Sequence, residues 1–315
     1  MSRIHEALKK AEQERASNQG GAAMDLPGPE SPQAIDVGPS MVIGAMAPAA
    51  EFAANASAPN ALSAFNLDAR CSQYEWKPDV STMLFMNGNN DAHGAEEFRT
   101  LRSRLYHLRE KKPLKKVLVT SALPKEGKSF TAANLAQVIV RQHGRRALLI
   151  DADLRGPRLH MMLGTNPGPG LSDYLQGKND EFSIMQRGPL ENLFFIPSGL
   201  IPSGSGIADP SELVSGTRLK LLLQRVEPLF DWIIVDSPPA LVVSDASVLA
   251  KVCDGVLLVV RSTVTPADVA RKAREEFPDE MMLGVVLNGT REKNGSYDRY
   301  YYDEYSSNKD TAAKI

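Results

Sequence analysis

The segment "SALPKEGKSF", residues 121–130, follows the apolar run "KKVLVT" (115–120) and leads into the helical pattern "FTAANLAQVIVRQ" (130–142). A loop between a strand and a helix that ends in glycine, lysine and serine is typical of a phosphate-binding loop, or P-loop. In such a loop the backbone N–H groups surround the phosphates, the lysine reaches the β- and γ-oxygens, and the hydroxyl binds Mg²⁺. The candidate nucleotide-binding residues of the segment are Pro124, Lys125, Glu126, Gly127, Lys128, Ser129 and Phe130.

The chain around this loop alternates between continuous apolar runs and amphipathic stretches. Runs such as "RALLI" (146–150), "WIIVD" (232–236) and "GVLLVV" (255–260) show no alternation with polar residues. Strands of that kind are buried on both faces, which is typical of a parallel sheet covered by helices. The sequence therefore predicts an α/β fold of the P-loop NTPase class, with a mostly parallel sheet and helices on both faces.

Three aspartates stand at the ends of two of these runs. Asp151 and Asp153 follow the first run, and Asp236 ends the second. Because α/β sheets bind ligands beyond the carboxyl ends of their strands, we expect the three carboxylates and the P-loop to meet in one crevice. A single aspartate can instead cap the next helix; for Asp245, in "VSDASVLA" (243–250), capping and nucleotide sensing both stay open. Together the residues predict a Mg²⁺–nucleotide site.

Composition excludes several classes of function. The chain has 315 residues and a formal net charge of -2, which gives no electrostatic reason to expect nucleic acid or an acidic membrane surface as its main partner. Its two cysteines, Cys71 and Cys253, form no CxxC pair, which argues against metal ribbons, iron–sulfur clusters and dithiol redox sites. No apolar run approaches the roughly 18 to 20 residues that cross a bilayer. We expect a cytoplasmic protein that does not insert directly into a membrane.

Changes in composition divide the chain into four predicted parts. Residues 1–16 place apolar side chains at helical spacing and predict a short amphipathic helix, which is either a docking peptide or a solvated helix. Residues 17–75 are rich in Ala, Pro, Gly, Ser and Asn and predict a disordered linker. Residues 76–290 form the predicted P-loop domain, and residues 291–315 form a tail.

The tail contains five of the eight tyrosines of the chain, which are Tyr297, Tyr300, Tyr301, Tyr302 and Tyr305. Some of them fall at helical spacing and could pack as an apolar stripe. A surface that stacks nucleic-acid bases is a weaker reading, because the tail balances its basic residues with acidic ones. A third reading is that the phenol oxygens accept phosphate.

The segments "SALPKEGKS", "LLIDADLRGP" and "WIIVDSPP", with the terminal tyrosine cluster, resemble the bacterial tyrosine kinase (BY-kinase) family over roughly residues 90–305. Members of that family are cytoplasmic kinases that govern capsule and exopolysaccharide polymerisation and export. The resemblance implies an ATP-dependent protein-tyrosine autokinase in which Lys128 holds phosphate. Mg²⁺ binding and activation of the incoming phenol are implied for Ser129, Asp151, Asp153 and Asp236. Nucleotide contacts are implied for Arg155 and, on the adenine, for Asn288.

The resemblance also implies an assembly. Glu96, Arg99 and Arg102 match the interface pattern Glu-x-x-Arg-x-x-Arg of the family, which implies a ring of identical subunits. The tail tyrosines of one subunit would then be phosphorylated by its neighbour. The expected activator is a separate membrane-embedded polysaccharide co-polymerase, which the segment 1–16 would contact. This places the protein at the inner membrane through a partner.

Two positions depart from the expected patterns, and a rival function remains. Lys125 stands where relatives usually have glycine, and Ala122 stands where the P-loop pattern begins with glycine. The rival is a positioning-type switch ATPase, which shares the fold and acts as a nucleotide-dependent binding module. Proteins of that class carry an extra lysine five positions before the P-loop lysine, and this chain has Leu123 there.

Overall fold

The computed structural model describes residues 67, 69–86, 94–200 and 209–290. The chain divides into two units, residues 1–56 and 57–315, and the described residues all belong to the second. The predicted N-terminal helix, most of the predicted linker and the tyrosine-rich tail lie outside the described residues. No helix within the described ranges is both long and apolar enough to cross a membrane.

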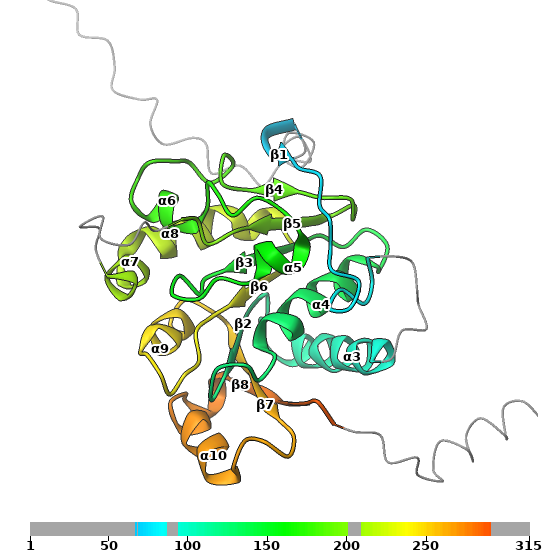
Figure 1. Ribbon diagram of the computed structural model, residues 1–315, viewed down its shortest axis with the longest axis vertical. Coiled ribbons are helices and arrows are strands. Elements are labelled where there is room, and N and C mark those ends of the chain that lie inside the picture. Colours follow the sequence, from blue (N-terminus) through cyan, green and yellow to red (C-terminus); the bar gives the residue numbers. More distant parts are fainter. Residues whose placement is uncertain (1–66, 68, 87–93, 201–208, 291–315) are drawn as a thin grey trace, which may run out of the picture. The chain divides into compact units, whose positions relative to one another are not determined.

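The centre of the structure is an eight-stranded sheet in the order β1-β4-β5-β3-β6-β2-β7-β8 (Figure 1). All pairings are parallel except that of β4 with β5. The strands are β1 (Ser72–Gln73), β2 (Lys116–Ser121), β3 (Ala147–Asp151), β4 (Gln186–Arg187), β5 (Leu193–Ile196), β6 (Trp232–Asp236), β7 (Gly255–Arg261) and β8 (Met282–Asn288). The predicted, mostly parallel sheet is confirmed.

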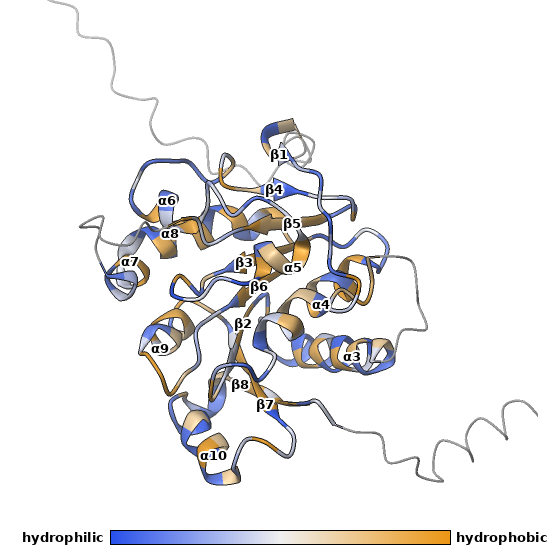
Figure 2. Cartoon of the chain, in the orientation of Figure 1, coloured by the Kyte–Doolittle hydropathy of each residue, from blue (hydrophilic) through white to orange (hydrophobic). Residues whose placement is uncertain are grey.

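Helices cover both faces of this sheet. They are α3 (Ala95–Lys111), α4 (Lys128–Val140), α5 (Leu159–Leu163), α6 (Leu171–Leu175), α7 (Pro210–Ser215), α8 (Thr217–Val226), α9 (Asp245–Ala250) and α10 (Ala267–Glu275). Short 3₁₀ turns cover Glu227–Leu229 and Asp279–Met281. Figure 2 shows the apolar residues concentrated on the strands and on the inner sides of the helices.

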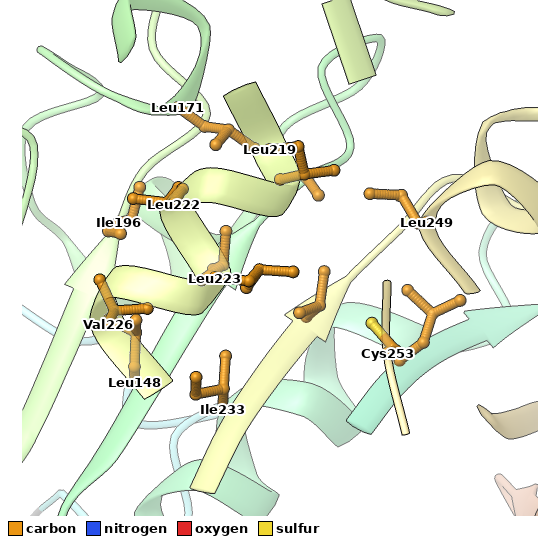
Figure 3. Packing of buried hydrophobic residues seen from close by; sticks show 14 of the residues in the cluster. Leu148, Leu171, Ile196, Leu219, Leu222, Leu223, Val226, Ile233, Leu249 and Cys253 are labelled. Atoms are coloured by element: carbon orange, nitrogen blue, oxygen red, sulfur yellow. The ribbon is translucent and has the colours of Figure 1, made fainter. Parts of the chain in front are cut away.

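Alternate residues of each central strand enter different cores. On β2, Leu118 packs in the core beneath α6, α8 and α9, whereas Val117 and Val119 pack in the core beneath α3 and α4. Figure 3 shows the first of these cores, where Leu148 of β3 and Ile233 of β6 lie under α8. Because side chains alternate between the two faces of a strand, a strand covered on both faces must be apolar throughout. This explains the continuous apolar runs of the sequence.

The helix that follows the P-loop, α4, is buried on nearly all sides. A side-chain amide fixes the segment before α3 against it: Asn134 accepts the Leu84 N–H at 2.8 Å and donates to the Thr82 carbonyl at 2.8 Å. On its other flank, the Arg102 guanidinium of α3 donates to the Val138 carbonyl at 2.8 Å. The helix that follows the P-loop is therefore held between the sheet, α3 and the segment around Thr82 and Leu84.

The predicted start of the domain at residue 76 is wrong, because the fold includes residues further toward the N-terminus. Strand β1 pairs with β4, and Leu67 and Cys71 are buried in the core that contains α6. Trp76 then packs edge-on against Phe195, with ring centroids 6.2 Å apart. A side chain at Gly188 would collide with the indole ring, so the fit is close. The average composition of the predicted linker hid these few apolar side chains.

We predict that Trp76→Ala lowers the free energy of unfolding by about 3 kcal/mol or more, because it removes a buried aromatic side chain and leaves a cavity. Urea unfolding of the full chain measures this change. Val80→Ala is the matched control, since Val80 lies in the same segment but is 67% exposed; we expect a change within about 0.5 kcal/mol. Equal effects of the two substitutions would mean that this segment does not belong to the cooperative core.

Candidate active site

The P-loop connects β2 to α4 and places its backbone at the N-terminus of a long, buried helix. Gly127 precedes α4 with φ 99°, a left-handed conformation that glycine adopts without strain. Lys128 and Ser129 begin the helix and are both buried. The free N–H groups and the dipole of a helix N-terminus favour a bound anion such as a phosphate. The strand–loop–helix context predicted from the sequence is confirmed.

Side chains from the far edge of the sheet hold the P-loop in shape. The Glu126 carboxylate accepts the Leu123 N–H at 2.7 Å and the hydroxyl of Thr265, and Glu126 is only 2% exposed. Asn288, at the end of β8, donates from its side-chain amide to the Glu126 carbonyl at 2.8 Å. A Cβ at position 127 would collide with this amide, which gives the glycine a second role. In this structure Glu126 and Asn288 therefore shape the loop.

Lys125 adopts the left-handed conformation that its position in the loop requires, with φ 67°. A residue with a Cβ is disfavoured there by about 1–2 kcal/mol relative to glycine. Its carbonyl accepts a hydrogen bond from the Arg261 guanidinium at 3.1 Å, which helps to fix the strained peptide. With the lysine at this position, Gly127 and Lys128 stand at the start of α4, as the P-loop pattern expects.

Three carboxylates converge on Lys128, as the sequence predicts. The register of the sheet places Asp151 of β3 directly beside Asp236 of β6. The Lys128 ammonium lies 2.8 Å from an oxygen of Asp153 and 3.8 Å from an oxygen of Asp236. Its nitrogen is also 3.2 Å from the Ser129 hydroxyl. One buried cation thus faces several buried anions.

The electrostatics of this cluster are strained, because burial disfavours charge. Burial, with the nearby Asp236 carboxylate, raises the pKa of Asp151 to about 8. Burial also raises the pKa of Asp236 to about 6, although Lys128 and Ser129 oppose the change. Burial alone would lower the pKa of Lys128, but Asp236 and Asp153 raise it above its ordinary value. Lys128 is therefore the positive charge that offsets the repulsion between the buried carboxylates.

The residues present fit a Mg²⁺ ion that is shared with a substrate. Mg²⁺ in phosphoryl-transfer sites usually takes one or two carboxylates, some waters and the phosphates. Both oxygens of Asp236 are buried without a well-formed hydrogen bond to any described residue, and the Ser129 hydroxyl is close by. Within the described ranges, no group of three or more His, Cys, Asp or Glu could hold a metal alone. A Mg²⁺ ion bound here would complete its coordination with waters and substrate phosphates.

The Arg155 guanidinium is held by acidic and hydroxyl side chains in this structure. Its guanidinium donates to Asp245 at 3.0 Å, to Asp209 at 2.7 Å and to the Ser211 hydroxyl at 2.6 Å. Asp245 is only 1% exposed and also accepts the Ser211 hydroxyl, at 2.5 Å. Its carboxylate forms no cap on α9, so the helix-cap reading of Asp245 is wrong. The cluster ties α7 and α9 to the connection that follows β3.

A cleft of about 750 Å³ opens over this cluster. The P-loop from Pro124 to Phe130, except Glu126, lines it, together with Asp153 and Arg155. Sequence reasoning missed the other lining residues, which are Asp79, Thr82, Gly156, Arg158, Met161, Met162, Pro238, Pro239, Val242 and Val243. Only the proline pair carried a signal, since it follows Asp236 after a single residue, Ser237.

The predicted interface residues lie on α3 and do not line this cleft. Arg99 and Glu96 form an ion pair one helical turn apart, at 2.8 Å. Arg102 is half-buried and is bonded to α4, as described above. All three border a second hollow on the surface of α3. Glu96 and Arg99 are thus at a surface, whereas Arg102 also has a structural contact within the subunit.

We predict that Asp236→Asn stabilises the nucleotide-free protein by about 1–3 kcal/mol, and by more at pH 7.5 than at pH 5. The folded state binds the Asp236 proton more tightly than the unfolded chain does. The native carboxylate therefore lowers stability increasingly as pH rises from its unfolded value of 3.8 through about 6. Thermal unfolding at the two pH values measures the gain.

Asp180→Asn is the control for that prediction. Hydrogen bonds from the Ser183 and Phe182 N–H groups lower the pKa of Asp180. Its contribution is therefore complete above the unfolded value of 3.8 and does not change between pH 5 and pH 7.5. We expect this variant to be slightly destabilised by the same amount at both values. A loss of stability in Asp236→Asn would contradict the prediction that the buried, charged carboxylate of Asp236 destabilises the folded state.

Comparisons with known proteins agree with this geometry. Residues 125–267 match a family model described as an AAA domain. The chain is 37% identical over 209 residues to the tyrosine-protein kinase YwqD of Bacillus subtilis. This match covers 66% of this chain and 86% of that protein. It is 32% identical over 232 residues to the tyrosine-protein kinase Wzc of Salmonella typhimurium. That match covers 73% of this chain but only 31% of the longer relative.

Two solved structures show the same fold with related sequences. The kinase domain of the Escherichia coli tyrosine kinase Etk is 30% identical, with a TM-score of 0.59, and the match covers 67% of this chain and 82% of that domain. The chimeric protein CapA2B2 is 28% identical, with a TM-score of 0.61, and the match covers 68% of this chain and 92% of the chimera. The identity to YwqD, over most of that protein, together with these two structures, shows that the chain belongs to the family of bacterial tyrosine-protein kinases.

Proposed function

We propose that this chain is an ATP-dependent protein-tyrosine kinase that phosphorylates its own C-terminal tyrosines. The observation that carries the proposal is the convergence of Lys128 with three buried carboxylates under an open cleft beside the P-loop. Phosphoryl transfer depends mainly on positioning and charge neutralisation, which this arrangement supplies. Membership of the family supports the choice of tyrosine as acceptor.

In this proposal the side chains at the base of the cleft divide the work. Lys128 leaves its pairing with Asp153 to hold the phosphates of ATP, and the N–H groups of the P-loop surround them. Ser129, Asp151 and Asp236 would hold Mg²⁺. When bound, that ion supplies positive charge against the phosphate oxygens. Because the cluster already contains more acid than base, it is prepared to accept this additional charge.

Asp153 is the carboxylate that an incoming phenol can reach. It lines the cleft, whereas Asp151 and Asp236 are fully buried beneath it. The phenol oxygen forms a bond to the γ-phosphorus of ATP, the bond from that phosphorus to the β–γ bridging oxygen breaks, and ADP leaves. The phenol proton passes to Asp153. The Gly156 N–H donates to the other oxygen of Asp153 at 2.9 Å and so orients the carboxylate.

The length of the tail permits transfer within a subunit or between subunits. β8, which leads to the tail, ends at the same edge of the sheet as β3, and four strand spacings of about 4.8 Å separate them, or about 19 Å. Nine residues run from Asn288 to Tyr297, and nine extended residues span up to about 30 Å. We propose transfer between subunits of a ring on the strength of Glu96, Arg99 and Arg102, since reach alone does not decide.

The cellular role is also a proposal. We infer that the kinase regulates capsule or exopolysaccharide production at the cytoplasmic face of the inner membrane. A membrane-embedded adaptor would recruit it through residues 1–16, with residues 17–75 as the linker. The family resemblance supports this inference. Several phosphates on one tail would repel each other and acidic neighbours, so that phosphorylation would loosen the ring.

A mixing experiment tests the central proposal. One full-length chain carries Tyr→Phe at all five tail positions, and the other carries Lys128→Met with its tail intact. We expect phosphotyrosine between Tyr297 and Tyr305 on the second chain after incubation with Mg-ATP. The loss of Lys128 removes the main charge on the phosphates, so that this chain alone should be at least about 100-fold slower. Mass spectrometry of the tail measures both.

The other outcomes of that experiment are equally informative. Modification of the wild-type chain, but not of the Lys128→Met chain in the mixture, would place transfer within one subunit. Unmodified tails together with nucleotide hydrolysis would overturn the kinase and favour the positioning-type switch ATPase. Lys220→Met is the matched control, because Lys220 is exposed on α8 and does not line the cleft.

We predict that Arg99→Glu prevents ring assembly without affecting the fold. The substitution places two acidic residues one turn apart on α3 and opposes any acidic partner on a neighbouring subunit. Arg102 is left intact because its bond to Val138 supports the fold. Sedimentation should show the monomer, and the melting temperature should change by no more than a few degrees. Rings that persist in this variant would show that the assembly does not use this face of α3.

A further inference from the structure

The outer part of the cleft is built by the connections that follow two neighbouring strands. β3, β6 and β2 lie side by side and end at one edge of the sheet (Figure 1). The P-loop follows β2 and forms the phosphate end of the cleft. The connection after β3 contributes Asp153 and Arg158, and the connection after β6 contributes Pro239 and Val242. The cleft therefore has a second end that the phosphate-binding groups do not fill.

Exposed apolar side chains line this second end. Met161 of α5 is 61% exposed, and Val242 is 55% exposed. They belong to different connections but line the same cleft as the catalytic Asp153. An aromatic ring placed between the connections would bury apolar surface on both sides, and the unbranched methionine adapts to such a ring. The phenol of a tyrosine has this shape, with its oxygen at the end that would face Asp153.

Arg158 places a positive charge at the same rim of the cleft. The backbone N–H groups of Arg158 and Leu159 donate to Asp151 at 3.3 Å and 3.1 Å, which fixes this segment to the catalytic cluster. The Arg158 guanidinium is exposed and has no ion pair within the described part of the chain. Arg155, three residues earlier, is fully engaged by contrast. Asp79 also lines the cleft, and Ser81 holds its carboxylate.

The tail carries the complementary charge. In "SYDRYYYDEYSS" (296–307) every tyrosine lies within two residues of Asp298, Asp303 or Glu304. The segment holds these three carboxylates against one arginine, so its net charge is -2. A rim cation beside an apolar slot suits a tyrosine with an acidic neighbour better than it suits a neutral or basic peptide.

We propose that Arg158, Met161 and Val242 form an acceptor subsite that binds the tail of a second copy of this chain. Met161 and Val242 contact the tyrosine ring, and Arg158 pairs with the carboxylate beside it. The proposal rests on the kinase function proposed above and adds the specificity of its acceptor site. Because the ion pair is exposed, we expect a moderate contribution, about a three- to tenfold change in the KM for the acceptor.

The test varies the charge on both sides of the contact. The enzyme is the full chain with Tyr→Phe at the five tail positions, with or without Arg158→Ala. The acceptor is the full Lys128→Met chain with one of two tails. One is the native tail; the other, called the neutral tail because amides replace its three carboxylates, carries Asp298→Asn, Asp303→Asn and Glu304→Gln. We expect Arg158→Ala to raise the KM for the native tail about three- to tenfold and to leave the KM for the neutral tail and for ATP unchanged. Lys220→Ala, on α8, is the control and should change nothing.

A charge reversal separates recognition from damage to the fold. Arg158→Glu should act poorly on the native tail and recover on a tail with Asp298→Lys, Asp303→Lys and Glu304→Lys. Met161→Ser should raise the KM for native and neutral tails alike. Equal KM values for both tails with Arg158 present, or no recovery in the reversed pair, would overturn the subsite while the kinase function stands. Absence of phosphate on every tail would instead overturn the proposed function itself.

Discussion

The pairing of one buried lysine with buried carboxylates is the constraint on which the site depends. The parallel register of β3 and β6 brings Asp151 beside Asp236 in the interior, where two negative charges without compensation would be very unfavourable. Lys128 reaches them only because the P-loop turns the chain from β2 into α4 at Gly127. The strand register and the P-loop together therefore bring the positive and negative charges of the site into contact. A chain without the lysine would keep buried acids with no internal cation.

The P-loop is also coupled to the strand from which the tail departs. Thr265 and Arg261 support the loop from the end of β7 and the turn after it, and Asn288 supports it from the end of β8. Residue 290, where the described part of the chain ends, is only two positions beyond Asn288. The last described strand, which leads to the tyrosine-rich part of the sequence, therefore ends at a residue that holds the Glu126 carbonyl of the nucleotide loop.

The sequence predicted the features that follow from repeated patterns, which are the strands and their ends. It did not predict the contacts made by short strands and loops. Apolar runs predicted the strands, and strand ends predicted the meeting of Asp151, Asp153, Asp236 and Lys128, because parallel topology makes these consequences of order alone. The two-residue strand β1 has no such pattern; it pairs with β4, and Trp76, which follows it, packs against Phe195 of β5. The partners of Arg155 and Asn288 depend on loop paths that no periodicity records. The rim residues were missed for the same reason.

The floor of the cleft is held by many contacts, whereas its rim consists of exposed side chains, and this difference suits phosphoryl transfer to several acceptors. The floor is fixed by strand register, helix packing and buried ion pairs, because phosphoryl transfer tolerates little misplacement. The rim is formed by an exposed methionine, a valine and an arginine, which in the proposed subsite recognise only a ring and a nearby charge. A site of this kind can accept several tyrosines in different local sequences, provided that each has an acidic neighbour. If the five tail tyrosines are acceptors, as proposed, a single catalytic centre can then serve all of them.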